Sequence, residues 1–299
     1  MAARAGTRSG FVALAGRPNA GKSTLVNALV GTKVAIVSDK PQTTRRAIRG
    51  VATGPDWQLV LVDLPGVQRP RDSLTERMQR RVERELADSD AVLVVLNADQ
   101  GIGGPGDRFI AAAVAASGLP IIAAVNKTDR LRHPQIAAAL QQAADLLPGA
   151  EVFPVSARRG TGVQALVDHL AGLVPPGPFL FPPEDRSDLS EAVLLAELIR
   201  EQVLRRTREE LPHAVEVQVE ELDLGREGLA VVRAYAWVET ESQKGILIGT
   251  GGAMIRAIGI AARKELEREL GCKVHLDLSV RVRRHWRADD ALLDRLGIE

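Results

Sequence analysis

The sequence has almost no residues of the kinds that build disulfides, cysteine-rich metal sites or membrane spans. Cys272 is the only cysteine, so the chain cannot form an internal disulfide or a zinc site of several cysteines, which suits a reducing compartment. The five histidines are scattered without metal-ligand spacing. No apolar run approaches the roughly 18 residues of a membrane span, and the polar tail over residues 1–9 lacks the apolar core of a secretory signal. These absences predict a cytoplasmic protein.

The sequence also lacks an excess of charge of either sign. It has 39 Lys plus Arg against 38 Asp plus Glu, a formal net charge of +1. No overall attraction for polyanions follows, and charge has to be interpreted locally. A chain of 299 residues is long enough for two domains with separate hydrophobic cores.

The segment Gly16–Ser23 has the spacing of a phosphate-binding loop, with two glycines followed by Lys22 and a hydroxyl. An apolar run of strand length precedes it, and apolar residues at helical spacing follow it. Backbone N–H groups in such a loop, and the positive end of the next helix, bind phosphate. A glycine-rich surface turn would lack this strand and helix. We expect the nucleotide to contact Arg17, Pro18, Asn19, Ala20, Gly21, Lys22, Ser23 and Thr24.

Further polar loops follow apolar runs of strand length along the first half of the chain. Because strands that alternate with helices form a parallel sheet, these loops should meet at one edge of it. The pattern predicts an α/β domain with a mostly parallel sheet. The strand and loop pairs are residues 57–62 with 63–66, 121–125 with 126–129, and 151–155 with 156–158, and residues 91–96 form one more strand.

Taken in order, these loops resemble the five signature motifs of P-loop GTPases. The resemblance implies that Asp129 accepts hydrogens from guanine, that Asn126 holds the loop and the base edge, and that the Ala157 N–H donates to the guanine oxygen. Lys127 and Ser156 belong to the same two motifs. The expected ligands are therefore GTP and GDP. Adenine lacks the matching donor pair, which disfavours ATP.

The same resemblance implies a magnesium ion and a slow hydrolysis of GTP. Ser23, Thr44 and Asp63 are the expected magnesium ligands, with Thr44 preferred to Thr43, and the expected catalytic residues are Lys22, Thr44 and Gly66. Val67 occupies the position at which Ras-like members carry a water-orienting glutamine. An apolar residue cannot orient water, so we expect slow turnover that RNA, the ribosome or a cation accelerates.

Asn19 has two alternative roles. In related GTPases with an apolar residue at the position of Val67, an asparagine placed like Asn19 helps to hold a potassium ion. The ordinary role of a residue at this point of a phosphate loop is structural. The sequence leaves both alternatives open, so K⁺ joins GTP, GDP and Mg²⁺ as a candidate cofactor.

A change in composition marks the start of a second domain. Residues 175–188 are rich in proline, which stiffens the chain and cannot continue a helix. The downstream pattern predicts a helix over 189–211, strands near 215–219 and 230–238, a stretch over 244–252 that ends in a glycine loop at 249–252, then a helix and a last strand over 276–282.

This order resembles a type II KH domain, a small α+β RNA-binding fold in which a Gly-x-x-Gly loop approaches the backbone of about four nucleotides. The loop here lacks the lysine that the family usually carries within it. Ten Lys or Arg against four Asp or Glu lie between Ser242 and Arg287, which offers compensating charge. The expected RNA-binding residues are Lys244, Ile248, Gly249, Thr250, Gly251, Gly252 and Arg256.

Both halves together resemble the Era family of bacterial GTPases. The resemblance implies binding to the 3′ end of small-subunit ribosomal RNA, a role in assembly of the 30S subunit, and a monomer. The alternative is a membrane-associated or protein-directed signalling GTPase whose second domain is an adaptor, with a peripheral contact at the cytoplasmic face of the membrane. The expected division is a flexible tail (1–9), a GTPase domain (10–174), a proline-rich linker (175–188) and a KH domain (189–299).

Overall fold

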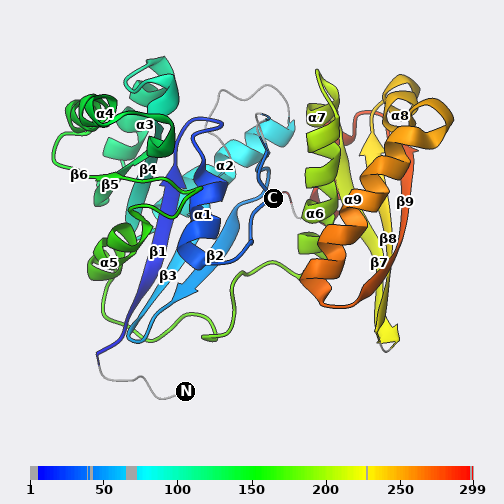
Figure 1. The fold of residues 1–299 in the computed structure, drawn as a ribbon, viewed down its shortest axis with the longest axis horizontal. Coiled ribbons are helices and arrows are strands. Elements are labelled where there is room, and N and C mark those ends of the chain that lie inside the picture. The colour runs from blue at the N-terminus through cyan, green and yellow to red at the C-terminus, as the bar shows by residue number, and fades with distance from the viewer. Residues whose placement is uncertain are drawn as a thin grey trace. The chain divides into compact units, whose positions relative to one another are not determined.

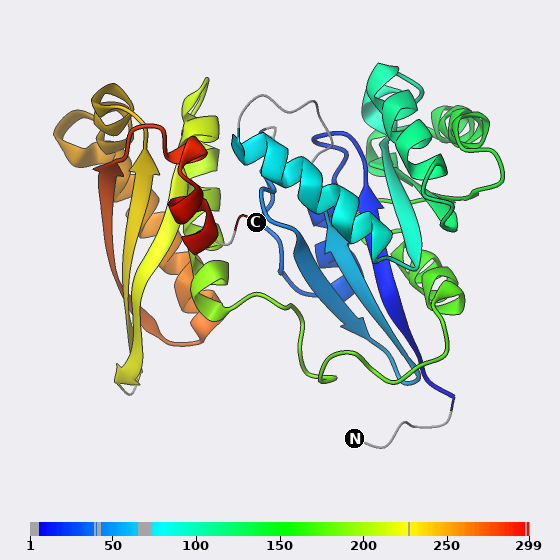
Figure 2. The ribbon, with the colours of Figure 1, turned by 180° about the vertical axis from the view of Figure 1, so that it is seen from behind.

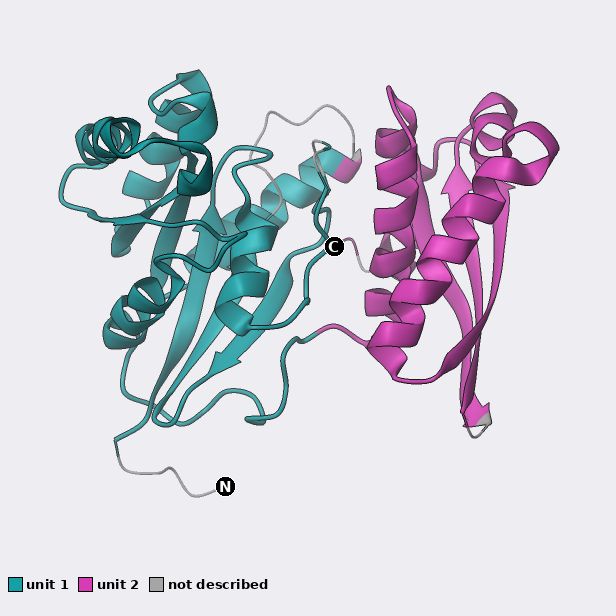
Figure 3. Ribbon diagram, in the orientation of Figure 1, with its two compact units in different colours: residues 1–71, 75–188 teal, residues 72–74, 189–299 magenta. Residues whose placement is uncertain are grey.

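The computed structural model describes residues 6–38, 40, 43–64, 73–226, 228–296 and 298. The chain divides into two compact units (Figure 1 and Figure 3). The first comprises residues 1–71 and 75–188, and the second comprises residues 72–74 and 189–299.

The first unit is built on a six-stranded sheet with the strand order β2-β3-β1-β4-β5-β6. All neighbouring strands run parallel except β2, which is antiparallel to β3. The elements in chain order are β1 (Arg8–Ala15), α1 (Lys22–Val30), β2 (Ile48–Thr53), β3 (Trp57–Asp63), α2 (Ser73–Ala87), β4 (Ala91–Asn97), η1 (Ala98–Gln100), α3 (Pro105–Ala115), β5 (Ile121–Asn126), η2 (Thr128–Arg130), α4 (His133–Leu146), β6 (Glu151–Pro154) and α5 (Val163–Leu173).

Helices cover both faces of this sheet. Alternate residues of β4 show this directly, because Leu93 and Val95 pack with α1 and α5, whereas Val92 and Val94 pack with α3 and α4. Helix α2 lies on the same face as α3 and α4 and is in front of the sheet in Figure 2. The continuous apolar runs of the sequence are explained by this double coverage. The predicted α/β class with a mostly parallel sheet is confirmed.

Strand β2 is missing from the strands that the sequence predicts. Its residues Ile48–Thr53 include an arginine and a glycine, so neither a continuous apolar run nor clean alternation marks it. Gly50 has no room for a side chain, since an added Cβ would lie 2.8 Å from Val26 Cγ1 of α1. Pairing with β3 and packing against α1 therefore form this strand.

The proline-rich segment lies along the first unit. The buried Gln58 side chain accepts hydrogen bonds from the N–H groups of Leu180 (2.7 Å) and Phe181 (2.9 Å). Further along, the Val51 N–H donates to the Arg186 carbonyl at 2.9 Å, beside the outer edge of β2. These bonds satisfy backbone groups that would otherwise be exposed at a sheet edge.

The second unit packs the helices of its hydrophobic core on one face of a three-stranded sheet in the order β7-β8-β9. β7 is antiparallel to β8, and β9 is parallel to it. This α+β arrangement confirms the predicted fold class. The elements are α6 (Glu191–Arg206), α7 (Leu211–Ala214), β7 (Glu216–Arg226), β8 (Leu229–Val238), α8 (Glu241–Ile248), η3 (Thr250–Gly252), α9 (Ala253–Leu270), β9 (Lys273–Val282), η4 (Trp286–Ala288) and α10 (Asp290–Arg295).

One predicted boundary in this unit is wrong, and one helix is missing from the prediction. The helix predicted over 189–211 ends at Arg206, and a separate turn, α7, follows with Pro212 in its first turn. Residues 241–248 form α8, a helix that the sequence does not predict, and the glycine loop follows from Gly249. Thr240 Oγ1 accepts from the Gln243 N–H, and Gln243 Oε1 accepts from the Thr240 N–H. This capping box starts α8.

No single helix in the described ranges has the length and apolar content of a membrane span. Together, α8 and the helical stretch Thr250–Leu270 reach that length and composition, although they meet at an angle of 42°.

Candidate functional site

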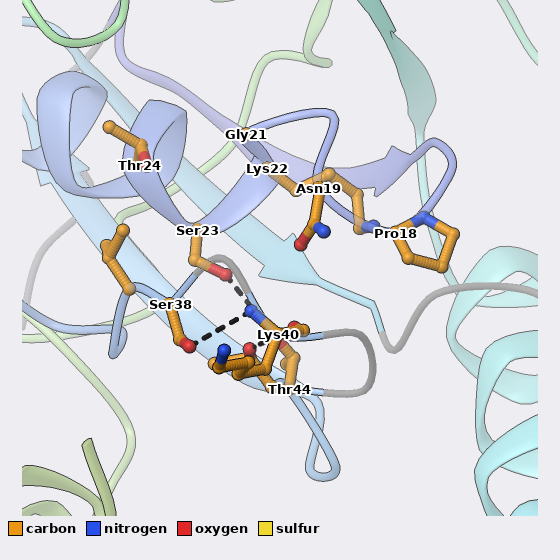
Figure 4. A pocket seen from close by; sticks show the side chains of 11 residues that line it. Pro18, Asn19, Gly21, Lys22, Ser23, Thr24, Ser38, Lys40 and Thr44 are labelled. Atoms are coloured by element: carbon orange, nitrogen blue, oxygen red, sulfur yellow. Dashed lines mark hydrogen bonds between the residues drawn. The ribbon is translucent and has the colours of Figure 1, made fainter. Parts of the chain in front are cut away.

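The loop between β1 and α1 encloses the ammonium group of Lys22. Its Nζ donates to the carbonyl oxygens of Gly16 (2.9 Å) and Arg17 (3.3 Å), and the side chain is buried. Asn19 has a φ of 62°, so the chain turns sharply here. The loop opens onto a pocket, shown in Figure 4, whose lining residues are Pro18, Asn19, Gly21, Lys22, Ser23, Thr24, Val37, Ser38, Lys40, Thr43 and Thr44.

Two glycines of this loop have steric reasons to be glycine. A Cβ on Gly16 would lie 2.5 Å from the Val95 carbonyl oxygen of β4. A Cβ on Gly21 would lie 2.4 Å from Asn126 Nδ2, and Gly21 has a φ of 96°. The glycine spacing of the motif therefore serves close packing against the ends of β4 and β5, besides the approach of phosphate.

Two hydroxyls and one carboxylate meet beside the loop. Ser23 Oγ donates to Asp63 Oδ2 at 2.5 Å, Thr44 Oγ1 donates to the same oxygen at 3.3 Å, and the two hydroxyl oxygens are 3.1 Å apart. The buried Asp63 Oδ1 has no hydrogen-bond partner among the described residues. A set of hard oxygen donors with an unused carboxylate oxygen fits Mg²⁺.

The structure also distinguishes the two neighbouring threonines. Thr43 Oγ1 donates to the Lys40 carbonyl at 2.6 Å, whereas Thr44 turns toward Asp63. Thr44 is therefore the threonine that joins the oxygen cluster. Gly66, expected to be catalytic, and Val67 lie outside the described residues.

Burial changes the acid–base properties of both charged groups in this site. Burial lowers the pKa of Lys22, and the attraction of Asp63 opposes that change. Burial likewise raises the pKa of Asp63, against the charge of Lys22 and the hydrogen bonds from Ser23 and Thr44. Charges withdrawn from water act strongly on a ligand. An anion beside Lys22 and a cation beside Asp63 would restore the favourable interactions lost by burial.

A second group of polar residues follows β5. Asn126 Nδ2 donates to the Ala20 carbonyl at 3.0 Å, and its Oδ1 accepts from the N–H groups of Lys127 (2.8 Å) and Ala157 (3.1 Å). Asn126 thus ties three loops together. The Ala157 N–H, expected to face guanine, donates to this side chain in the structure. Lys127, with a φ of 67°, donates from Nζ to the Asn19 carbonyl at 2.7 Å.

Ser156 holds the Asp129 carboxylate in place, since its Oγ donates to Asp129 Oδ1 at 2.7 Å. This hydrogen bond is the main cause that lowers the pKa of Asp129. The group therefore stays ionised near neutral pH. An oriented, ionised carboxylate with a second oxygen available can accept two parallel N–H bonds.

Sequence reasoning missed Asn97, the last residue of β4. Its Nδ2 donates to the Asn19 carbonyl at 3.2 Å, beside the bond from Lys127. A detectable signal existed, because Asn97 directly follows the apolar run 91–96, and ligand loops gather at the carboxyl ends of parallel strands.

The second unit carries a groove between α9 and β9. Two arginines and several apolar side chains line it: Gly251, Gly252, Ile255, Arg256, Gly259, Ile260, Arg263, Val274, His275, Leu276 and Leu278. Lys244 lies on α8 and pairs with Glu241 at 3.9 Å. Ile248 ends α8, directly before the loop.

The loop at the end of this groove contains three glycines with positive φ. Gly249 (72°) faces inward, since an added Cβ would lie 2.8 Å from the Met254 Cβ. Gly251 (58°) and Gly252 (77°) have open space where a side chain would point. The outer face of the loop therefore leaves room for a chain to approach closely.

Two family models match the chain. The model described as a 50S ribosome-binding GTPase matches residues 11–127, and the KH domain model matches residues 210–287. These matches cover the nucleotide loops through Lys127 and the glycine loop with its groove.

Curated relatives and solved structures match nearly the whole chain. The GTPase Era of Mycobacterium avium (strain 104) is 47% identical over 97% of this chain and 98% of the relative, and that of Mycobacterium tuberculosis (strain ATCC 25177 / H37Ra) is 46% identical with the same coverage.

Among solved structures, Era in complex with MgGDPNP and nucleotides 1506–1542 of 16S ribosomal RNA matches with a TM-score of 0.92 and 33% identity, covering 98% of this chain and 99% of that one. An Aquifex aeolicus Era variant bound to GDP and AlF4⁻ matches with the same TM-score and 32% identity. At these identities over almost the full length, the chain belongs to the Era family of GTPases.

Proposed function

We propose that this GTPase binds the 3′ end of 16S ribosomal RNA through its second unit and acts in assembly of the 30S subunit. The bound nucleotide controls the RNA contact. The observation that carries the proposal is the glycine loop whose outer side is open, beside a groove with two arginines. A relative of the same architecture has been solved with nucleotides 1506–1542 of that RNA.

In the first unit, each residue group has a proposed role in hydrolysis of GTP to GDP and phosphate. Lys22 and the loop N–H groups stabilise charge on the outer phosphates. Ser23, Thr44 and Asp63 hold Mg²⁺, which neutralises phosphate charge when bound. Asn126 and Asp129 select guanine, with Ser156 fixing the carboxylate. Gly66 is proposed as a further catalytic residue.

We propose that residues 10–174 act as the nucleotide-binding domain, 175–188 as the connection, and 189–299 as the RNA-binding domain. The tail expected over 1–9 is shorter than that, because β1 begins at Arg8. The protein is proposed to act in the cytoplasm as a monomer. A peripheral membrane contact is the alternative, and sedimentation of the protein with vesicles of bacterial lipids would reveal it.

A potassium ion at Asn19 is a further proposal. The Asn19 carbonyl already accepts from Lys127 Nζ and Asn97 Nδ2, so the backbone is anchored, and the side chain lies at the pocket (Figure 4). GTP hydrolysis measured in K⁺ should be about tenfold faster than in Na⁺, and Asn19→Ala should remove the difference. Equal rates in the two salts would contradict a potassium site.

The RNA-binding role is tested with Gly251→Asp. The space beyond this position is open and Asp tolerates a positive φ, so the fold should persist. A carboxylate directed at an RNA phosphate should weaken binding about tenfold or more, with an unchanged GTPase rate. The measurement is the affinity for RNA of nucleotides 1506–1542 at several salt concentrations. Unchanged affinity would move the RNA site elsewhere.

A further inference from the structure

The sheet of the second unit has one face opposite α6, α8 and α9, which pack on its other face. In β8, the residues Ala230, Val232, Ala234, Ala236 and Val238 are fully buried against the helices. The intervening residues Tyr235 and Trp237 therefore point to the opposite face. Figure 2 views this face, with α9 behind the three strands, whereas α9 is in front of them in Figure 1.

Four polar or aromatic side chains adjoin on this face. Tyr235 and Trp237 meet edge to face with ring centroids 5.9 Å apart. The Arg281 guanidinium lies 3.6 Å from the centroid of the Tyr235 ring, and Trp237 Nε1 donates to Gln218 Oε1 at 3.1 Å. Register agrees, since Trp237 pairs with Arg281 and Gln218 with Tyr235. We name Gln218, Tyr235, Trp237 and Arg281 the outer patch.

Arg281 differs from two neighbouring arginines of the sheet in its ion pairing. Arg233 pairs with Glu221 and Asp277, and Arg283 pairs with Asp289. Arg281, in contrast, forms no hydrogen bond or ion pair among the described residues; its guanidinium lies over the Tyr235 ring, and the residue is exposed. Stacking on the ring fixes the guanidinium plane while its N–H groups stay available. The patch therefore offers one oriented cation beside flat aromatic surface.

Contacts between neighbouring side chains on a sheet face also stabilise exposed sheets, but this chain has few tyrosines and tryptophans to place on its surface. It has one tyrosine and three tryptophans, and the tyrosine adjoins one of the tryptophans. By comparison, Trp286 is fully buried, with Nε1 bonded to the Ala214 carbonyl. A half-exposed aromatic pair with a cation is the combination that binds unpaired bases and their phosphates.

Strand β9 connects the outer patch to the proposed RNA groove. Val274, Leu276 and Leu278 line the groove, and Arg281 belongs to the patch. From Leu276 to Arg281 the strand advances about 16 Å at roughly 3.3 Å per residue, a distance that a few nucleotides cover. The RNA in the relative's complex, nucleotides 1506–1542, is far longer than the roughly four nucleotides that a KH groove holds.

We propose that the outer patch is a second RNA contact, separate from the groove. It takes a base against Trp237 and Tyr235 and a neighbouring phosphate on Arg281, from RNA that flanks the segment held in the groove. This inference rests on the proposed function, because it assumes that the second unit binds RNA.

The test compares two RNAs on the full-length protein. One is nucleotides 1506–1542, and the other is the shortest nested fragment that still responds to Gly251→Asp. Trp237→Ala and Arg281→Ala should each lower the affinity for the long RNA about tenfold and leave the affinity for the short fragment unchanged. Arg281→Ala should also lower the salt dependence by about one phosphate contact. Trp237→Leu keeps an apolar side chain but removes the aromatic ring, and it should lower the affinity for the long RNA as much as Trp237→Ala does.

Matched controls remove an exposed aromatic and an exposed arginine elsewhere. Phe109→Ala and Arg268→Ala, which are 53% and 70% exposed, should change neither affinity. If the patch variants leave the affinity for the long RNA unchanged while Gly251→Asp lowers it, the outer patch is not an RNA contact and the proposed function is still supported. Equal losses of affinity for both RNAs would also contradict a separate contact at the outer patch. If only the patch variants lower the affinity, the outer patch binds RNA and the proposed groove does not.

Discussion

Replacing Asp129 with asparagine should lower the affinity for GTP by about a hundredfold or more and create affinity for xanthosine triphosphate. An ionised carboxylate accepts the ring N–H and the exocyclic amine of guanine, whereas an asparagine amide presents a donor to that amine. Xanthine carries an oxygen in place of the amine, so the amide donor finds an acceptor there. Ser156 Oγ, which donates to Asp129 Oδ1, can still donate to the asparagine oxygen.

Competition binding with GTP, xanthosine triphosphate and ATP measures this change. Asp145→Asn is the control, because Asp145 is exposed on α4 and accepts only from Gln141 among the described residues. It should bind GTP as the unaltered protein does. Retention of full GTP affinity by Asp129→Asn would mean that another group recognises the base.

Gly21→Ala should weaken nucleotide binding at least tenfold, although the change adds one methyl group. The new Cβ would lie 2.4 Å from Asn126 Nδ2, which donates to the Ala20 carbonyl. Losing that buried bond costs about 1–3 kcal/mol, and the left-handed backbone adds about 1–2 kcal/mol of strain. Because Asn126 also holds the Lys127 and Ala157 N–H groups, both phosphate and base contacts should suffer.

Gly31→Ala is the control that separates the collision with Asn126 from the backbone strain of a side chain at positive φ. Gly31 ends the same helix with a φ of 82°, and an added Cβ there meets nothing within 4 Å. This variant should lose thermal stability while its nucleotide affinity stays unchanged. The comparison uses melting temperature together with the dissociation constant of a fluorescent GTP analogue. Similar nucleotide affinities for the two variants would show that the contact with Asn126 has little effect on binding.

Local spacing was sufficient to predict the nucleotide loops, because their chemistry resides in consecutive residues. The runs at 16–23, 63–66 and 126–129 follow strands, and strand ends must meet at one sheet edge. The glycine loop of the second unit, residues 249–252, could be predicted from the sequence in the same way. The missed elements depend on distant partners, since β2 forms by pairing with β3 and residues 180–181 are held by Gln58.

By itself, the sequence determined the two fold classes and the positions of three loop motifs, at 16–23, 126–129 and 249–252, since each motif is a short run of residue types. The tertiary structure alone decided that Asn97 and Lys127 anchor Asn19, and that Gly21 must leave space for Asn126. These are contacts between loops far apart in the chain, and only folding of the strands into one sheet brings their side chains within bonding distance.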